Sequence, residues 1–406
     1  MSSANSAIAL TPHTGAPGAL SESDHPAPLR YAGRRDASPD REREERGRAR
    51  SGIAPPIVLL AAMGADDAPQ ARELEAAITG GIHAAIPSAR VVHAPVIGGI
   101  EGFTRGLMRI LRGTIEQVIS TGPHGEHVSV SLGLAGTAGR RIGVFEIDEA
   151  VELEQLPPEH RDPTRASSRG VGQLIRAAMD RGVCRLIIGC GDSGANDGGI
   201  GMAAELGVRF LDARRMEIVE AGGLQRLAAI DMSRRDPRLD QITIEAVVNP
   251  ADDLIGERGV ARVYGPRKGA SPAQVLRLER GLVTFATVTQ RELGLDAAAL
   301  PGGGASGGLG AGLVAFAGAR LIPRLAFEQQ ALGLDATLAA ADVLVTTGDT
   351  PVWLARRAAD RGLAVITLDA GARTAGGQSL ANVRAESARS ICSVMSAIGW
   401  PPILAS

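Results

Sequence analysis

Aliphatic runs alternate with amphipathic stretches near the start of the chain. The run "PIVLLAA" at 56–62 is predicted to form a buried strand, because nearly every position is apolar. The stretch after it has large aliphatic residues at every fourth position, which places them on one face of a helix. These residues are Leu74, Ile78, Ile82 and Ile86. A second strand, "RVVHAPV", and a second helix, "EGFTRGLMRILRG", complete a strand-helix-strand-helix pattern typical of a parallel sheet.

The same alternation returns at the other end of the chain. The segments "ADVLVTTG" and "LAVITLD" are predicted strands, and "PVWLARRAADRG" and "SLANVRAESARSICSVMSAIGW" are predicted helices. The middle of the chain differs, since "EQVIS" and "HVSVSLG" alternate with period two around a Gly/Pro turn and predict a hairpin. Further strands are predicted at "RRIGVFEI", "CRLIIGC" and "QITIEAVV".

These patterns predict an α/β fold with a discontinuous parallel-sheet domain and an inserted mixed-sheet domain. We expect residues 55–115 and 291–406 to form the first domain and residues 116–290 the inserted one. Residues 1–54 are rich in Pro, Ser, Arg and acidic side chains and have few aliphatic ones, so a disordered extension is expected there.

Composition excludes several classes of function. The formal net charge is −2 and aromatic residues are 2% of the chain, so neither a basic field nor stacking platforms favour nucleic acid. The longest apolar runs are too short for a membrane span. The three cysteines have no metal-type spacing, and Cys184 and Cys190, which flank one predicted buried strand, are predicted to be reduced. A cytoplasmic protein without a membrane partner is the expectation.

A glycine-rich loop follows the strand "CRLIIG". Its sequence, "CGDSGANDGG" at 190–199, leads into a short predicted helix, and a loop of this kind exposes backbone N–H groups that favour bound anions. Asp192 and Asp197 carry the hard oxygen ligands that Mg²⁺ prefers. The alternative is a tight turn in which Asn196 or Asp197 only caps the helix. The loop alone leaves both interpretations open.

Two further loops carry candidate chemistry. Gly302, Gly304 and Gly307 match G-x-G-x-x-G, but a predicted helix end precedes them where a dinucleotide fingerprint requires a strand. In "YGPRKGASPAQV", Arg267 and Lys268 stand before a helix expected to start near Pro272. Two cations beside a helix N-terminus are suited to clamp a phosphate, although a solvated turn has the same composition. Lys268 is the only lysine in the chain, against 42 arginines.

Taken in order, these loops resemble those of the bacterial glycerate kinase family over residues 55 to 400. The segment "SSRGVGQLI" resembles T-S-x-G-V-G-E-L-I, and "GCGDSGANDGGIGMAAELG" is similar to G-x-G-G-S-A-T-N-D-G-G-A-G-M-A-x-x-L-G. The segment "VYGPRKGAS" resembles V-F-G-P-Q-K-G-A, and "PGGGASGGLGAGLVAF" resembles P-G-A-G-A-A-G-G-L-G-x-x-L. The resemblance implies transfer of the γ-phosphoryl group of ATP, with Mg²⁺, to a hydroxyl of glycerate or a related small hydroxy acid. It also implies a discontinuous α/β domain with an inserted second domain; a homodimer is compatible with it.

Combining loops and resemblance gives a set of candidate residues. Catalytic roles are expected for Asp192, Asp197 and Lys268, with Asp197 also expected to bind the metal. Nucleotide or substrate binding is expected for Gly191, Ser193, Asn196, Gly198, Gly199, Arg267, Gly302, Gly303, Gly304, Ser306, Gly307, Glu101, Ser168 and Arg169.

The chain also departs from the family pattern. The family's D-S-F-K-G-S loop is replaced by "AAMGADDAP", and the aspartate of A-D-G-G-E-G-T has become Gly98, whereas Glu101 and Gly102 persist. The segment "LVTTGDT" runs directly into "PVWLARR", so the family's T-G-E-G-x-x-D-x-Q loop has no counterpart beyond Asp349. Phosphoryl transfer depends on cations around the transferred group, so two interpretations follow. The enzyme has an altered acceptor, or it is a degenerate homologue that binds a ligand or partner without turnover.

Overall fold

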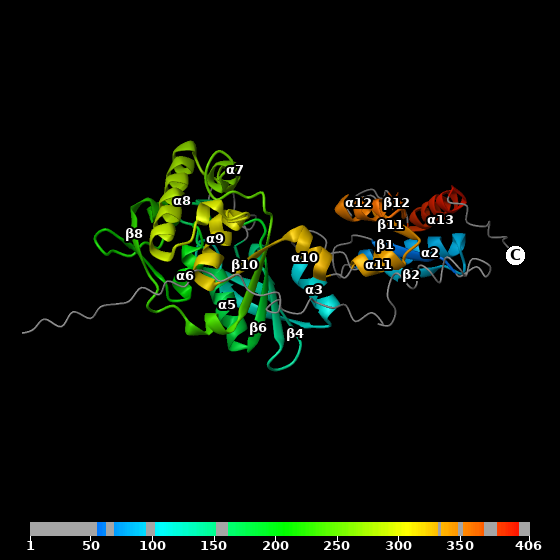
Figure 1. The fold of residues 1–406 in the computed structure, drawn as a ribbon, viewed down its shortest axis with the longest axis horizontal. Helices are drawn as coiled ribbons and strands as arrows, with labels where there is room; N and C mark the ends of the chain where they lie inside the picture. The colour runs from blue at the N-terminus through cyan, green and yellow to red at the C-terminus, as the bar shows by residue number, and fades with distance from the viewer. Residues whose placement is uncertain are drawn as a thin grey trace, which may run out of the picture.

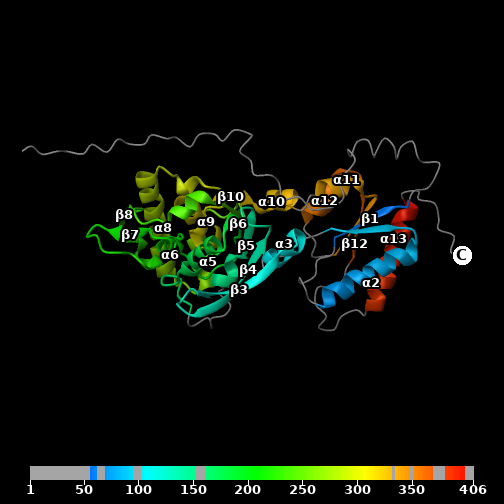
Figure 2. The ribbon, with the colours of Figure 1, turned by 90° about the horizontal axis from the view of Figure 1, so that it is seen from below.

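The computed structural model describes residues 55–61, 69–94, 102–151, 161–331, 334–347, 352–368 and 380–397. The expected N-terminal extension, residues 62–68 and 348–351, and the candidate residue Glu101 lie outside these ranges. Two parallel or mixed sheets, each covered by helices, occupy separate parts of the molecule in Figures 1 and 2.

The first sheet, sheet A, is assembled from both ends of the chain. Its strands are all parallel and stand in the order β12-β11-β1-β2. Their bounds are β1 (Ile57–Ala61), β2 (Arg90–His93), β11 (Val343–Thr347) and β12 (Ala364–Leu368). The nearby helices are α2 (Pro69–Ala85), α11 (Leu334–Ala340), α12 (Val352–Asp360) and α13 (Leu380–Ala397). The predicted sharing of one sheet by the two chain ends is therefore confirmed.

The apolar spacing of α2 explains how sheet A is covered. Ile78 and Ile82 are fully buried and join Val58 and Leu60 of β1 in one core cluster. Val383 and Ile391 of α13 belong to the same cluster, because α13 packs beside α2.

The second sheet, sheet B, is larger and mixed. Its order is β10-β9-β6-β5-β4-β3, with β3, β4 and β5 antiparallel neighbours and the remaining pairs parallel. The bounds are β3 (Thr114–Thr121), β4 (His127–Ala135), β5 (Arg141–Glu146), β6 (Val183–Gly189), β9 (Thr243–Val248) and β10 (Arg320–Pro323). A separate ribbon consists of β7 (Arg209–Asp212) and β8 (Leu227–Asp231). The hairpin predicted around the Gly/Pro turn is the β3–β4 pair.

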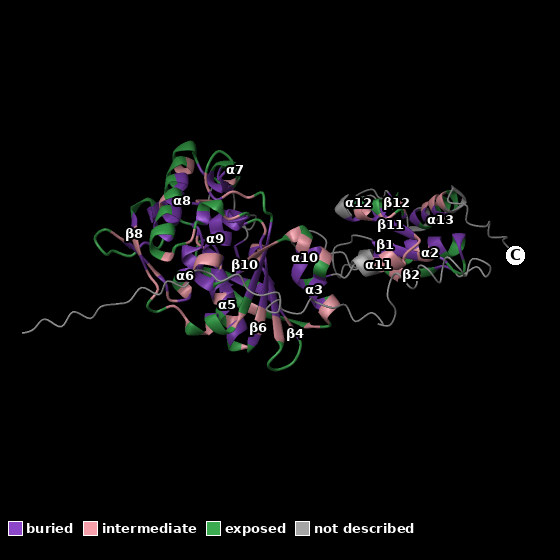
Figure 3. Cartoon of the chain, viewed as in Figure 1, coloured by how far each residue is buried: buried purple, intermediate pink, exposed green. Residues whose placement is uncertain are grey.

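Helices cover both faces of sheet B. One face buries the largest core cluster, seen as the buried interior in Figure 3. That face is covered by α5 (Arg169–Asp180), α6 (Ile200–Glu205), α8 (Pro272–Leu293) and α9 (Ala305–Ala317). The other face buries Val144, Ile187 and Val247 against α3 (Phe103–Leu111) and α10 (Arg324–Ala331). Short elements complete this part: α4 (Ile147–Val151), η3 (Ala221–Arg226), η4 (Pro237–Gln241), α7 (Val260–Tyr264), η5 (Pro266–Lys268) and η6 (Ala297–Ala299).

Two segments that lie outside the expected inserted domain in sequence belong to sheet B in the structure. Residues 103–111 and 301–323 fall outside the expected inserted range of 116–290. Nevertheless, α3 packs on sheet B and β10 pairs with β9. Alternation of strands and helices reports the type of each element but not which sheet it joins. The division into domains stays a prediction, and we propose that the unit around sheet B extends from Phe103 to Ala331.

Candidate functional site

The candidate residues gather where the parallel strands of sheet B end. β5, β6 and β9 run parallel, and end at Glu146, Gly189 and Val248. The segments that follow them carry Asp148, Asp192 and Asp252. Ligands of open α/β sheets commonly bind at this carboxyl edge, so the topology places charged side chains in a position suited to binding.

Two glycine-rich loops contact each other at this edge. We call residues 190–199 the first glycine loop and residues 301–308 the second. The N–H of Gly198 donates to the carbonyl of Gly307 over 3.1 Å, and the Ser306 hydroxyl donates to the carbonyl of Gly191 over 2.8 Å. Gly307 has φ +76°, and a Cβ there would collide with the carbonyl oxygen of Ala195. A glycine is therefore required for the two loops to approach this closely.

Lys268 joins the first glycine loop to η5. Its side chain is buried, and Nζ donates a hydrogen bond of 2.7 Å to the carbonyl of Ala195. Burial lowers the pKa of the Lys268 ammonium to about 8, although the carboxylates of Asp192, Asp197 and Asp252 oppose that shift. Arg267, next in sequence, is exposed and lies 3.8 Å from the Asp192 carboxylate. Lys268 is therefore in direct contact with the first glycine loop, and its predicted contact with a phosphate stays a prediction.

Asp197 is enclosed by hydrogen-bond donors. Its Oδ2 accepts from the N–H and hydroxyl of Ser168, both over 2.9 Å, and from the N–H of Gly201 over 3.1 Å. Its Oδ1 accepts from the N–H of Gly199 over 2.9 Å. The Ser168 hydroxyl also accepts from the N–H of Met202, so this network ties the start of α5 to the start of α6. The bonding supports the alternative in which Asp197 caps the helix.

Asn196, one residue earlier, is in the opposite situation. Its side chain is fully buried, yet neither its amide nitrogen nor its amide oxygen has a hydrogen-bond partner among the described residues. A buried amide without partners costs about 1–3 kcal/mol, a cost that a bound ligand would offset. The N–H groups of Gly191, Asp192 and Ser193 also donate to no acceptor within the described part of the chain. The first glycine loop therefore has several N–H donors that the described residues leave unused.

Sequence reasoning missed two acidic groups at the same edge. Asp252 accepts a hydrogen bond of 2.9 Å from the Tyr264 hydroxyl, and its main-chain carbonyl accepts from the N–H of Gly304. Burial raises the pKa of Asp252. Glu146, the last residue of β5, is fully buried, and burial raises its pKa to about 8. Both residues stand at the carboxyl end of a strand, which is the sequence signal that could have identified them.

The remaining candidates contribute mainly to the framework. Arg169, at the start of α5, is exposed and forms an ion pair of 2.8 Å with Glu205 of α6. In the second glycine loop, Gly303 donates to the carbonyl of Leu300. A Cβ at Gly302 would lie 2.5 Å from Val248, so this glycine allows close packing on the end of β9. These contacts support local structure and leave a binding role for the three residues a prediction.

The two aspartates of the first glycine loop differ in how well they suit Mg²⁺. Within the described ranges, no group of three or more His, Cys, Asp or Glu side chains is arranged to hold a metal. The carboxylate of Asp197 is buried and already accepts four hydrogen bonds, which does not suit a metal ligand. The side chain of Asp192 is 84% exposed, and within the described residues it has one long contact, to Arg267. Asp192 is therefore the exposed carboxylate of this loop.

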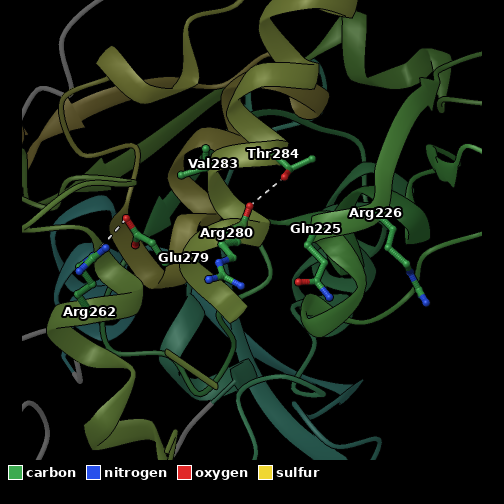
Figure 4. A pocket seen from close by; sticks show the side chains of 7 residues that line it. All are labelled: Gln225, Arg226, Arg262, Glu279, Arg280, Val283 and Thr284. Carbon is green, nitrogen blue, oxygen red and sulfur yellow. Dashed lines mark hydrogen bonds and ion pairs between the residues drawn. The ribbon is translucent and has the colours of Figure 1, made fainter. Parts of the chain in front are cut away.

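A shallow pocket lies elsewhere on this unit, over α8 (Figure 4). Its lining comes from η3, α7 and α8 and includes no residue of either glycine loop. Arg262 lies 3.4 Å from the buried carboxylate of Glu279, which also accepts from the N–H of Gly256.

Among the helices that the structure describes, none is long and apolar enough to cross a membrane.

Known proteins resemble the chain over most of its length. The model of the Glycerate kinase family matches residues 58–398. A protein described as "Glycerate kinase" from Halalkalibacterium halodurans is 39% identical over 303 residues, which span 72% of this chain and 79% of that protein. "Glycerate 2-kinase" from Escherichia coli is 39% identical over 266 residues, or 65% of this chain and 69% of that protein.

A solved structure agrees with these matches. The crystal structure of a protein described as putative glycerate kinase 2 from Salmonella typhimurium LT2 superimposes with a TM-score of 0.71 at 35% identity. The superposition covers 84% of this chain and 98% of that one. The predicted resemblance and fold class are confirmed. The chain belongs to the glycerate kinase family.

Proposed function

We propose that this protein transfers the γ-phosphoryl group of ATP to a hydroxyl of glycerate or of a related small hydroxy acid. Family membership supports a glycerate-kinase-like phosphotransferase. The observation that carries the proposal is the contact between the two glycine loops, with Lys268 and Asn196 buried beside it. The cytoplasm stays the predicted compartment, and a small molecule the predicted partner.

The side chains of this edge suit the charge distribution of phosphoryl transfer. The unused N–H groups of the first glycine loop are donors for phosphate oxygens, which is the usual role of such loops. Lys268 holds its ammonium against the loop through Ala195 and adds positive charge close to these donors. The buried amide of Asn196 offers a donor and an acceptor that a bound substrate would satisfy.

Mg²⁺ bound to the nucleotide would supply neutralisation of the phosphate charge. We assign the contact with that ion to Asp192, because its carboxylate is exposed and that of Asp197 is not. Asp197 instead keeps the first glycine loop in shape through Ser168 and Gly201. Catalysis by such enzymes rests mainly on positioning and charge, so a rigid loop is itself part of the function.

The direct test is an activity assay. Purified protein is incubated with Mg²⁺-ATP and D-glycerate, or with a panel of small hydroxy acids, and ADP formation is followed. Phosphorus NMR of the product identifies the phosphorylated hydroxyl. We expect ADP to form with at least one hydroxy acid and not with the matching deoxy acid. Background ADP formation with every acceptor, from a protein that is folded by circular dichroism, would reject the proposal.

The second candidate is a degenerate homologue that binds a ligand or partner without turnover. The observation favouring it is the loss of the family's serine and lysine from "AAMGADDAP" and of the acidic loop after "LVTTG". One preorganised donor is worth about 3 kcal/mol of transition-state stabilisation, so several losses matter. Calorimetry with ATP separates the cases: binding without turnover supports this candidate, whereas turnover excludes it.

A further inference from the structure

Among the strands that the structure describes, β3 is an outer edge of sheet B, as Figure 2 shows. It pairs with β4 through eight consecutive residues without a register shift. Its sequence, "TIEQVIST", has no proline, lysine or arginine, and its one charged side chain, Glu116, is paired with Arg181. The opposite edge, β10, is short, begins at Arg320 and ends at Pro323. The two edges of sheet B are therefore protected very differently.

The hydrogen bonds around the hairpin show which backbone groups of β3 are unused. The N–H of Gly122 donates to the carbonyl of Glu126 over 2.7 Å. Because bonded residues alternate along an antiparallel pair, the even-numbered residues of β3 bond to β4 and the odd-numbered ones face outward. Consistently, the N–H of Thr121 donates to the Gln173 side chain instead of to β4. The N–H and C=O groups of residues 115, 117 and 119 thus point away from the sheet.

The side chains of these three residues stand on one face of the strand. Ile119 is 66% exposed and Ile115 is 38% exposed. The β4 residues opposite the three are small, namely Ser129, Ser131 and Gly133. Gln117 lies over β4, where it bonds to the hydroxyls of Ser129 and Ser131. Two isoleucines four residues apart therefore project from an edge whose backbone groups are unpaired.

We propose that β3 pairs antiparallel with β3 of a second copy of this chain, about a two-fold axis at Gln117. In that register Gln117 is opposite its own copy, and Ile115 is opposite Ile119 of the second copy. All three outward residues then exchange backbone hydrogen bonds, and each exposed isoleucine gains an aliphatic partner. A shift of two residues in either direction would oppose isoleucine with glutamine, and in one direction it would also pair Ile115 with Thr121, whose N–H is already bonded. The strand is thus complementary to itself in one register.

The first experiment measures the oligomeric state of the full chain. Sedimentation velocity is run over a wide range of concentrations on wild type, Ile119→Lys and Val219→Lys. Val219 is the matched control, because it is 65% exposed and lies far from β3 in sequence. We expect dimers for wild type and Val219→Lys, and monomers for Ile119→Lys. Monomeric wild type at every concentration, or dimers of Ile119→Lys as stable as wild type, would overturn the proposal.

The second experiment tests the register. Directly opposed residues of a bonded antiparallel pair have Cα atoms about 5.5 Å apart, within disulfide reach. Gln117→Cys, in a Cys392→Ser background, should therefore form a cross-linked dimer under mild oxidation. Ile119→Cys is the control, since its own copy would be about 14 Å away along the strand at about 3.4 Å per residue. Equal cross-linking of both variants, or none at position 117, would contradict pairing about Gln117.

Discussion

The ammonium nitrogen of Lys268 lies 2.7 Å from the carbonyl oxygen of Ala195, to which it donates a hydrogen bond. This bond fixes η5 against the first glycine loop at a point where both are buried. The only lysine of the chain is therefore part of the framework of the site, whatever else it contacts. From the sequence we predicted a phosphate contact, with a solvated turn as the alternative; the structure shows a buried hydrogen bond to the loop backbone, and the phosphate contact stays a prediction.

The first prediction concerns Lys268→Arg. A guanidinium is larger and planar, and the buried position beside Ala195 was formed around a compact ammonium. We expect turnover with ATP to fall at least about tenfold, which corresponds to about 1.4 kcal/mol. We also expect a lower melting temperature, measured by differential scanning calorimetry. Arg267→Lys, at the exposed neighbouring position, is the control and should retain its stability. Wild-type stability of Lys268→Arg would show that the site tolerates the larger group.

The second prediction concerns pH and Glu146. Burial raises the pKa of Glu146 from the ordinary 4.5 to about 8. Between these two pH values, Glu146 is therefore protonated in the folded protein and ionised in the unfolded chain. The stability this group contributes is present below pH 4.5 and is lost as pH rises toward 8. In Glu146→Gln the side chain can still accept the N–H of Thr104 but does not titrate.

Urea unfolding of both proteins at several pH values measures this effect. The free energy of unfolding of wild type, relative to Glu146→Gln, should fall by more than about 1.4 kcal/mol between pH 5 and pH 8, the equivalent of one pKa unit. A difference that stays constant with pH would mean that Glu146 titrates normally.

The third prediction separates two roles for Asp197. If its carboxylate holds the fold through four donors, Asp197→Asn loses acceptors for Ser168 and Gly201. Hydrogen bonds to a charged group are worth about 1.5–3 kcal/mol each, so we expect at least about 3 kcal/mol of destabilisation. Asp192→Asn, at the exposed position, should leave unfolding unchanged and lower the affinity for Mg²⁺-ATP. If Asp197→Asn is instead as stable as wild type and its activity no longer depends on Mg²⁺, Asp197 is the residue that binds the metal.

The sequence predicted local elements and motifs better than it predicted the packing of distant segments. Periodicity identified α2, the β3–β4 hairpin and the sharing of sheet A by both chain ends, because each depends on local patterns of burial. It could not show that α3 and β10 join sheet B, since that depends on packing between distant segments. Motifs identified both glycine loops and Lys268. They could not separate Asp197, which is enclosed by donors, from Asn196, which has none, because one loop sequence permits both arrangements.

The last prediction uses this contrast. Asn196 is buried and both polar atoms of its amide lack partners in the described structure. Leucine has a similar shape and no polar atoms, so Asn196→Leu removes an unsatisfied group without opening a cavity. We expect the free energy of unfolding of the ligand-free protein to stay the same or to increase by about 1 kcal/mol. We expect kcat/KM for phosphoryl transfer to fall at least about tenfold, since the amide is held ready for a ligand.

Thr289→Val is the matched control for this prediction. The hydroxyl of Thr289, in α8, is likewise buried without a partner, and valine has the same shape as threonine. Both variants should therefore gain or keep stability in chemical unfolding, whereas only Asn196→Leu should lose activity and the stabilisation that wild type gains from added Mg²⁺-ATP. If Asn196→Leu keeps full activity, its amide is an unpaired group that the fold merely tolerates. If it unfolds while Thr289→Val does not, the amide has a bonding partner in solution that belongs to the framework and not to a ligand.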